Sequence, residues 1–78
     1  MRKKTKKLVV TFETTTGAIK METLCKEHNI SGRLISVPKQ ITAGCGMAWC
    51  TEPEKEKNLK EFMLKQKIIW EGIYTVLI

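Results

Sequence analysis

The sequence predicts a single α+β domain in which helices cover one face of an antiparallel sheet. Three observations lead to this prediction: an alternating apolar segment near the start, two segments with apolar residues at three- and four-residue steps, and short β-rich segments between and after them. The order along the chain is strand, helix, strand, strand, helix, strand. At 78 residues the chain is long enough for one compact domain and too short for two.

The first part of the chain predicts a strand and a helix. Residues 8–12 alternate between two faces and are rich in β-branched side chains, as a strand requires. Apolar residues then recur every three or four positions, which predicts a helix over about residues 15–28. Asn29 follows where a left-handed cap residue is expected. The helix can be capped at its start by the hydroxyl groups of three threonines, Thr14, Thr15 and Thr16.

The second part of the chain predicts two strands, a helix and a last strand. Residues 33–37 form the second strand, which Pro38 ends because proline cannot donate to a ladder. A loop over residues 39–44 leads to a third strand over 46–51. Thr51-Glu52-Pro53-Glu54 has the pattern of a capping box with proline in the first turn. The helix that follows turns Leu59, Phe62 and Met63 inward, and the last strand covers about residues 69–77.

The order β-α-β-β-α-β predicts a ferredoxin-like fold when both helices pack on one face of the sheet. In that topology the first and second strands run in the same direction and the third returns. The loop before the third strand therefore lies at the edge of the sheet where the first helix begins.

The positive charge of the chain is concentrated at its start. The formal net charge is +6, and five basic residues lie within residues 1–7. We therefore expect a flexible basic tail over residues 1–7 and a nearly neutral single domain over residues 8–78. The aromatic residues are not interleaved with this basic run, so nucleic acid, bound through Arg2 to Lys7, is the least favoured partner.

Neither a membrane span nor a disulfide framework is expected. No apolar stretch approaches the roughly 18 residues that cross a bilayer. Three cysteines cannot all pair within one chain, which agrees with a reducing compartment. We expect a cytoplasmic protein with free thiols and no bound cofactor.

The residues needed for a metal site or a conventional hydrolase are not present together. His28 lies three residues after Cys25, but zinc usually takes three or four ligands. The chain has no Asp, and its one His is far from Cys45 in the predicted topology. A phosphate-binding glycine loop and a Cys-x-x-Cys pair are also missing.

Cys45 is the candidate reactive residue, because glycine flanks it on both sides in Gly44-Cys45-Gly46. The predicted topology places it near the start of the first helix, around residues 14–17. Unpaired N–H groups and the helix dipole favour an anion there, so the pKa of the thiol should be lowered. Lys39 and Lys67 would add positive potential at the same edge.

The flanking glycines have two explanations. Without β-carbons they let a partner or a second sulfur atom approach Cys45 closely. Alternatively they only permit a tight turn, and Cys45 is a small filler. The other two thiols are weaker candidates: Cys25 lies on the apolar face of the first helix, and Cys50 points to the face opposite Cys45.

Two segments around this cysteine, with three weaker ones, resemble a known family. The stronger segments are Val37-Pro38-Lys39-Gln40-Ile41 and Gly44-Cys45-Gly46-Met47-Ala48. The weaker are Thr11-Phe12, Glu22-Thr23-Leu24 and Asn29-Ile30. On these residues the chain resembles, from Leu8 to about Tyr74, the Se/S carrier protein-like family of small bacterial proteins. Trp49-Cys50 departs from the family pattern, which has an aliphatic residue followed by a basic one.

The resemblance implies a carrier rather than a conventional enzyme. Cys45 would hold sulfur or selenium as a persulfide or selenylsulfide, supported by the motif residues Gly44, Gly46, Pro38, Lys39 and Ala48. Its partners would be proteins that donate and accept the sulfur or selenium, and a homodimer is left open.

A second hypothesis needs no reactive thiol. In it the chain is a non-catalytic protein-interaction or ligand-sensing module of the same fold, and Gly44-Cys45-Gly46 is only a structural turn. An exposed sheet surface near Trp49 and Trp70 would then contact the partner.

Overall fold

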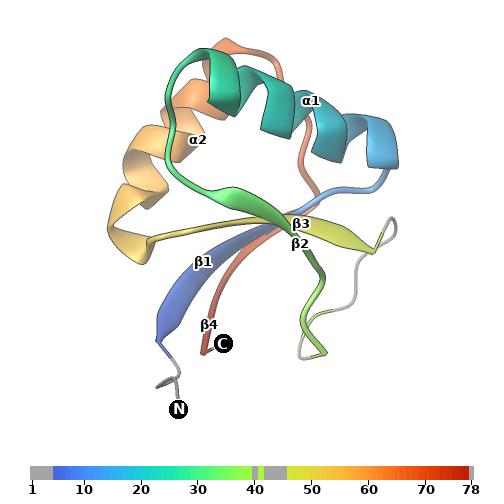
Figure 1. Ribbon diagram of the computed structural model, residues 1–78, viewed down its shortest axis with the longest axis vertical. Coiled ribbons are helices and arrows are strands. Elements are labelled where there is room, and N and C mark those ends of the chain that lie inside the picture. Colours follow the sequence, from blue (N-terminus) through green and yellow to red (C-terminus); the bar gives the residue numbers. More distant parts are fainter. Residues whose placement is uncertain (1–4, 40, 42–45, 78) are drawn as a thin grey trace.

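Two helices lie on one face of a four-stranded antiparallel sheet in the computed structural model (Figure 1). The structure describes residues 5–39, 41 and 46–77. In chain order the elements are β1 (Lys6–Thr11), α1 (Thr15–Glu27), β2 (Arg33–Ser36), β3 (Met47–Thr51), the 3₁₀ helix η1 (Pro53–Lys55), α2 (Glu56–Lys65) and β4 (Gly72–Leu77). The strand order β2-β3-β1-β4 confirms the predicted ferredoxin-like α+β sandwich.

Strand β1 lies in the interior of the sheet, with β3 on one side and β4 on the other. Val10, for example, lies opposite Trp49 of β3 and Ile73 of β4. Residues 8–12 are all buried, because side chains on one face of β1 meet the helices and those on the other meet a second apolar cluster. The alternation in the sequence therefore marks a strand that is covered on both faces.

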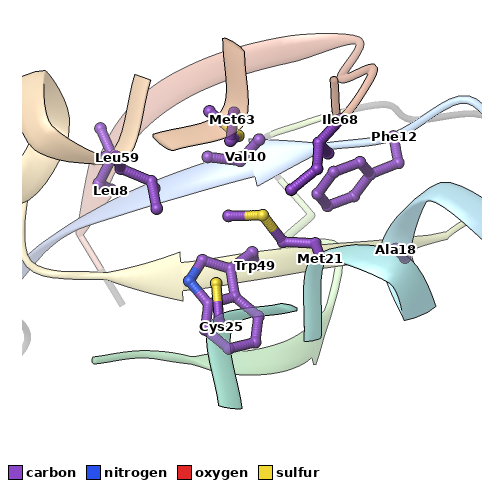
Figure 2. Packing of buried hydrophobic residues seen from close by; sticks show 10 residues of the cluster. All are labelled: Leu8, Val10, Phe12, Ala18, Met21, Cys25, Trp49, Leu59, Met63 and Ile68. Atoms are coloured by element: carbon purple, nitrogen blue, oxygen red, sulfur yellow. The ribbon is translucent and has the colours of Figure 1, made fainter. Parts of the chain in front are cut away.

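The main core fills the space between the sheet and the two helices (Figure 2). Three buried side chains come from α1 and two from α2, and each helix turns its polar residues to solvent. Full burial of an aliphatic or aromatic side chain contributes about 1.5–3 kcal/mol to folding, so this cluster is the main stabilising element of the fold. Its members are Leu8, Val10, Phe12, Ala18, Met21, Cys25, Trp49, Leu59, Met63 and Ile68.

The two helices begin differently. Thr14 is the N-cap of α1, and its Oγ1 accepts a hydrogen bond from the backbone N–H of Gly17 at 3.2 Å, as predicted. The capping box predicted for the second helix is wrong. The hydroxyl of Thr51 donates to the Ser31 carbonyl instead, at 3.1 Å, and α2 follows the 3₁₀ turn η1 without a side-chain cap.

Both helices end in the same backbone motif. The N–H of Ile30 donates to the Cys25 carbonyl at 2.8 Å, and the N–H of Ile68 donates to the Met63 carbonyl at 2.9 Å. The residue before each donor is left-handed, with φ 56° at Asn29 and 58° at Lys67. This is the Schellman arrangement, which satisfies carbonyls at the end of a helix. Asn29 was predicted in this role, whereas Lys67 was not.

Two strand boundaries differ by two or three residues from those expected, and the others by at most one. β1 begins at Lys6, so Lys6 and Lys7 lie in the sheet opposite Leu77 and Val76 of β4. β4 begins at Gly72 rather than near residue 69, because the turn at Lys67 is followed by irregular backbone over residues 68–71. No helix within the described residues is long and apolar enough to cross a membrane.

Candidate functional site

The segment between β2 and β3 carries the candidate thiol. Cys45 and Gly44 lie outside the described residues, so the site is described from the residues on either side. The backbone N–H of Val37 donates to the Gly46 carbonyl at 3.0 Å, and the N–H of Ile41 donates to the Pro38 carbonyl at 3.0 Å. Gly46 has a φ of 75°, a conformation that residues with a side chain rarely adopt. The Val37–Gly46 hydrogen bond therefore joins the two ends of the β2–β3 connection, and the Ile41–Pro38 hydrogen bond closes a local turn after β2.

Two described residues of the connection, Val37 and Ile41, also pack on the face of the sheet that the helices leave uncovered. Ile41 is only 9% exposed and forms a second apolar cluster with Val9 and Ala48. Val37 packs against the same cluster. The two motif segments thus meet in space: one supplies Val37 and Ile41, and the other supplies Gly46 and Ala48. The cluster gives Ala48 a role that the sequence did not reveal, because a larger side chain would compete with Ile41 for this space.

The start of α1 and the ends of the β2–β3 connection lie at the same edge of the sheet. β3 is antiparallel to both β1 and β2, so β1 and β2 run in the same direction, as predicted. The connection that leaves the end of β2 is therefore on the side where β1 leads into α1. The distance from Cys45 to the helix involves a residue outside the described part of the chain and stays a prediction.

A surface pocket of about 310 Å³ opens at the start of α1. Lys20 Nζ donates to the Lys67 carbonyl at 3.3 Å, which joins α1 to the turn that precedes β4. The charged residues that line the pocket are two lysines and one glutamate. Ile69, which also lines it, is 81% exposed. The lining residues are Glu13, Thr14, Thr16, Gly17, Lys20, Lys67 and Ile69.

The predicted supporting residues are only partly brought together here. Lys67 lies at the pocket as expected, and Lys39 is exposed on the connection. Among the three threonines only Thr14 is the N-cap; Thr15 and Thr16 are exposed in the first turn. Lys20 was missed. Its position near the start of α1 could have predicted this role, because a long side chain there reaches neighbouring segments.

Cys25 is packed in the main core, as predicted. Its side chain is fully buried on α1, next to Trp49 in the same cluster. Burial disfavours the charged form and raises the pKa of the Cys25 thiol to about 11. Because the thiolate is the nucleophile, Cys25 is a structural residue in the folded protein.

Cys50 lies on the helix-free face of β3 and is 6% exposed. Burial raises the pKa of its thiol, and the positive charges of Lys7 and Arg33 partly offset that effect. Cys50 is one of the residues that line a surface pocket of about 300 Å³, together with the charged residues Lys7, Arg33 and Glu52. Cys25 and Cys50 both carry free thiols, and neither is ready to ionise.

His28 is a helix-end residue, as expected. It is the C-cap of α1, and its ring packs edge-on against Phe62 with ring centroids 5.2 Å apart. Within the described residues no three His, Cys, Asp or Glu side chains gather as a metal site would require.

The interaction surface expected near Trp49 and Trp70 is wrong in its main residue. Trp49 is 2% exposed and lies in the main core beneath the helices (Figure 2). Trp70 is half-buried and packs against the same core. The open face of β3 carries Ala48 and Cys50, whereas Trp49 lies on the face that the helices cover.

Part of the basic run at the start of the chain is used inside the domain. Lys7 Nζ lies 2.8 Å from Glu52 Oε1, which joins β1 to the segment before η1. Lys6 and Lys7 are strand residues. The ion pair with Glu52 reduces the charge of Lys7 that is available for nucleic acid.

Comparison with known proteins gives one match. The family model described as "Putative Se/S carrier protein-like" matches residues 7–75, which cover nearly the whole chain and both motif segments. No curated protein and no solved structure matches the chain.

Proposed function

Because the chain belongs to the Se/S carrier protein-like family, we propose that it holds a sulfane sulfur or selenium atom on Cys45 and hands it to an acceptor protein. The two described cysteines are buried and have raised pKa values, which leaves Cys45 as the thiol for this chemistry. The free thiols of Cys25 and Cys50 are in keeping with a reducing compartment, and we place the carrier in the cytoplasm.

One observation carries the proposal most directly: the two motif segments that flank Cys45 contact each other. The Val37 N–H donates to the Gly46 carbonyl, and Ile41 packs on Ala48. These contacts fix the two ends of the connection relative to each other. A carrier needs such an arrangement to present one thiol at a defined end of the sheet. The positive charges of Lys20 and Lys67 at this edge would favour the thiolate.

The proposed reaction is thiol–persulfide exchange. The thiolate of Cys45 attacks the terminal sulfur of a donor persulfide; the donor's S–S bond breaks, and its cysteine leaves as a thiolate. Cys45 then carries the persulfide, and an acceptor thiolate repeats the exchange. Selenium follows the same route when the donor supplies a selenylsulfide. Each step conserves electrons, so no separate oxidant or reductant is required.

The test is transfer of sulfur from a cysteine desulfurase. The protein is incubated with the enzyme and cysteine, and its intact mass is measured without reductant. We expect one sulfur atom of added mass in the wild type and in Cys50→Ala, and none in Cys45→Ser. Cys50→Ala is the matched control because Cys50 lies five residues away in the same part of the chain. Equal loading of Cys45→Ser would show that the carrier thiol is another residue.

A further inference from the structure

The two edge strands of the sheet differ in how well they are protected. β2 has four residues, begins at the exposed Arg33 and is followed by Pro38. β4 has six residues, Gly-Ile-Tyr-Thr-Val-Leu, with no charge and no proline. Charged residues, proline and short length are the usual means by which proteins prevent an edge strand from pairing with another chain. β4 lacks all three.

The β4 edge also presents apolar side chains. Tyr74 is 41% exposed and Leu77 is 52% exposed. The phenol ring of Tyr74 lies over Gly72, since a β-carbon at Gly72 would be 2.8 Å from the Tyr74 hydroxyl oxygen. An aromatic ring over an edge glycine stabilises the extended conformation of the strand. β4 therefore already has the backbone conformation that pairing with another strand requires.

We propose that β4 pairs antiparallel with β4 of a second copy of this chain, giving a two-fold dimer with one continuous sheet. In an antiparallel pair, residues opposite each other point to the same face. A two-fold axis perpendicular to the sheet keeps both helix layers on one side, and centring it on Tyr74 pairs residues 72–76 of β4 with those of the other copy. Tyr74 then faces Tyr74 of the other copy, and Gly72 faces Val76.

Complementary charges at the two ends of β4 favour a second copy of this chain as the partner, and they favour the antiparallel direction. Glu71 precedes β4, whereas Lys6 lies opposite Leu77 at the other end of the strand. In the antiparallel dimer, Glu71, at the bend just before β4 of one copy, comes near Leu77 of the other, and Lys6 lies one strand further in, within reach of the Glu71 side chain. The two-fold axis makes this pair twice. A parallel arrangement would instead bring like charges together.

The first test is the mass of the full chain in solution, measured by light scattering over a wide dilution series. We expect a dimer that dissociates on dilution. Thr75→Lys adds a charge at an exposed position of β4 and should give a monomer, whereas Ser36→Lys, at an exposed position of β2, should leave the dimer unchanged. A monomeric wild type, or a dimer that survives Thr75→Lys, would overturn the proposal.

The second test does not depend on how Thr75→Lys folds. Glu71→Lys and Lys6→Glu should each raise the dimer dissociation constant roughly tenfold, because each removes two surface ion pairs. The double variant should restore most of the affinity. Within one chain these residues lie at opposite ends of the β1–β4 pair, so restoration can only come from contact between copies. If the losses of dimer affinity in the two single variants add up in the double variant, the antiparallel pairing of the two β4 strands is contradicted.

Discussion

The indole nitrogen of Trp49 lies against Gly32. A β-carbon built on Gly32 would be 2.5 Å from Trp49 Nε1 and 2.8 Å from the Cys50 carbonyl oxygen, and the φ of Gly32 is 136°. Nε1 is buried, and no group among the described residues forms a hydrogen bond with it. The close approach of the Gly32 backbone is what lets Trp49 fit under the helices beside β2.

Gly32→Ala should therefore be strongly destabilising. The new methyl group meets a buried ring and a backbone oxygen, and the backbone is unfavourable for alanine, so we expect a loss of about 3 kcal/mol in the free energy of unfolding. The matched control is Gly46→Ala. Gly46 also has positive φ, but no atom of the described residues lies within 4 Å of the position that a β-carbon would take, so the expected loss is only about 1 kcal/mol. Urea unfolding measures both, and equal losses would contradict the crowding at Gly32.

Lys67→Gly should stabilise the protein. Lys67 holds the left-handed position after α2, where glycine is the usual residue, and the cost of that conformation is about 1 kcal/mol. Thermal unfolding should show a gain of roughly 0.5–1 kcal/mol. Asn29→Gly, at the equivalent position after α1, should gain less because asparagine tolerates the conformation better. A loss of stability in Lys67→Gly would show that the lysine side chain contributes more than its backbone costs.

The packing of the β2–β3 connection can be tested with two isoleucines. Ile41 is 9% exposed and Ile69 is 81% exposed. Ile41→Ala should lower the free energy of unfolding by about 2 kcal/mol, since it removes a buried side chain from the cluster with Val9 and Ala48. Ile69→Ala should change it by less than about 0.5 kcal/mol. If Ile41→Ala costs no more than Ile69→Ala, the connection is not held by this contact in solution.

The buried thiol of Cys25 should make stability fall at alkaline pH. Its pKa is about 9.0 when exposed and about 11 in the folded protein. Above pH 9 the unfolded chain loses this proton while the folded protein retains it, so ionisation favours unfolding until the folded thiol also titrates. The expected loss between these two pH values is about 2 kcal/mol. The difference between wild type and Cys25→Ala, measured by urea unfolding across this range, isolates the effect from the lysines. A constant difference would contradict it.

Most of the fold could be predicted from local patterns. Alternation located β1, the three- and four-residue spacing located α1, and the order of the elements specified the topology. The start of α2 was missed because Thr51-Glu52-Pro53-Glu54 matches a capping box, while the Thr51 hydroxyl is used by Ser31 across the sheet edge. A local sequence pattern cannot predict a hydrogen bond between residues that are 20 positions apart.

The surroundings of the candidate site could be predicted in part. The predicted topology places the start of α1 at the same end of the sheet as the β2–β3 connection, and the structure confirms this placement. The burial of Ile41 could not be predicted, because a single apolar residue in a loop has no periodicity that reports where it packs. The burial of Trp49, which was expected near an exposed surface, could not be predicted for a related reason. Its strand is apolar on both faces, so alternation gave no direction.

The strand order also has a consequence for the chain as it is synthesised. β1 and β2 are not neighbours, since β3 lies between them, and β4 completes the other side of β1. A nascent chain that ends before residue 47 therefore contains no pair of strands that can join, and α1 has no sheet to cover. The domain should fold only once β3 has emerged from the ribosome, and fully once β4 has followed. Until then the thiol of Cys25 is open to oxidants from which the folded protein shields it.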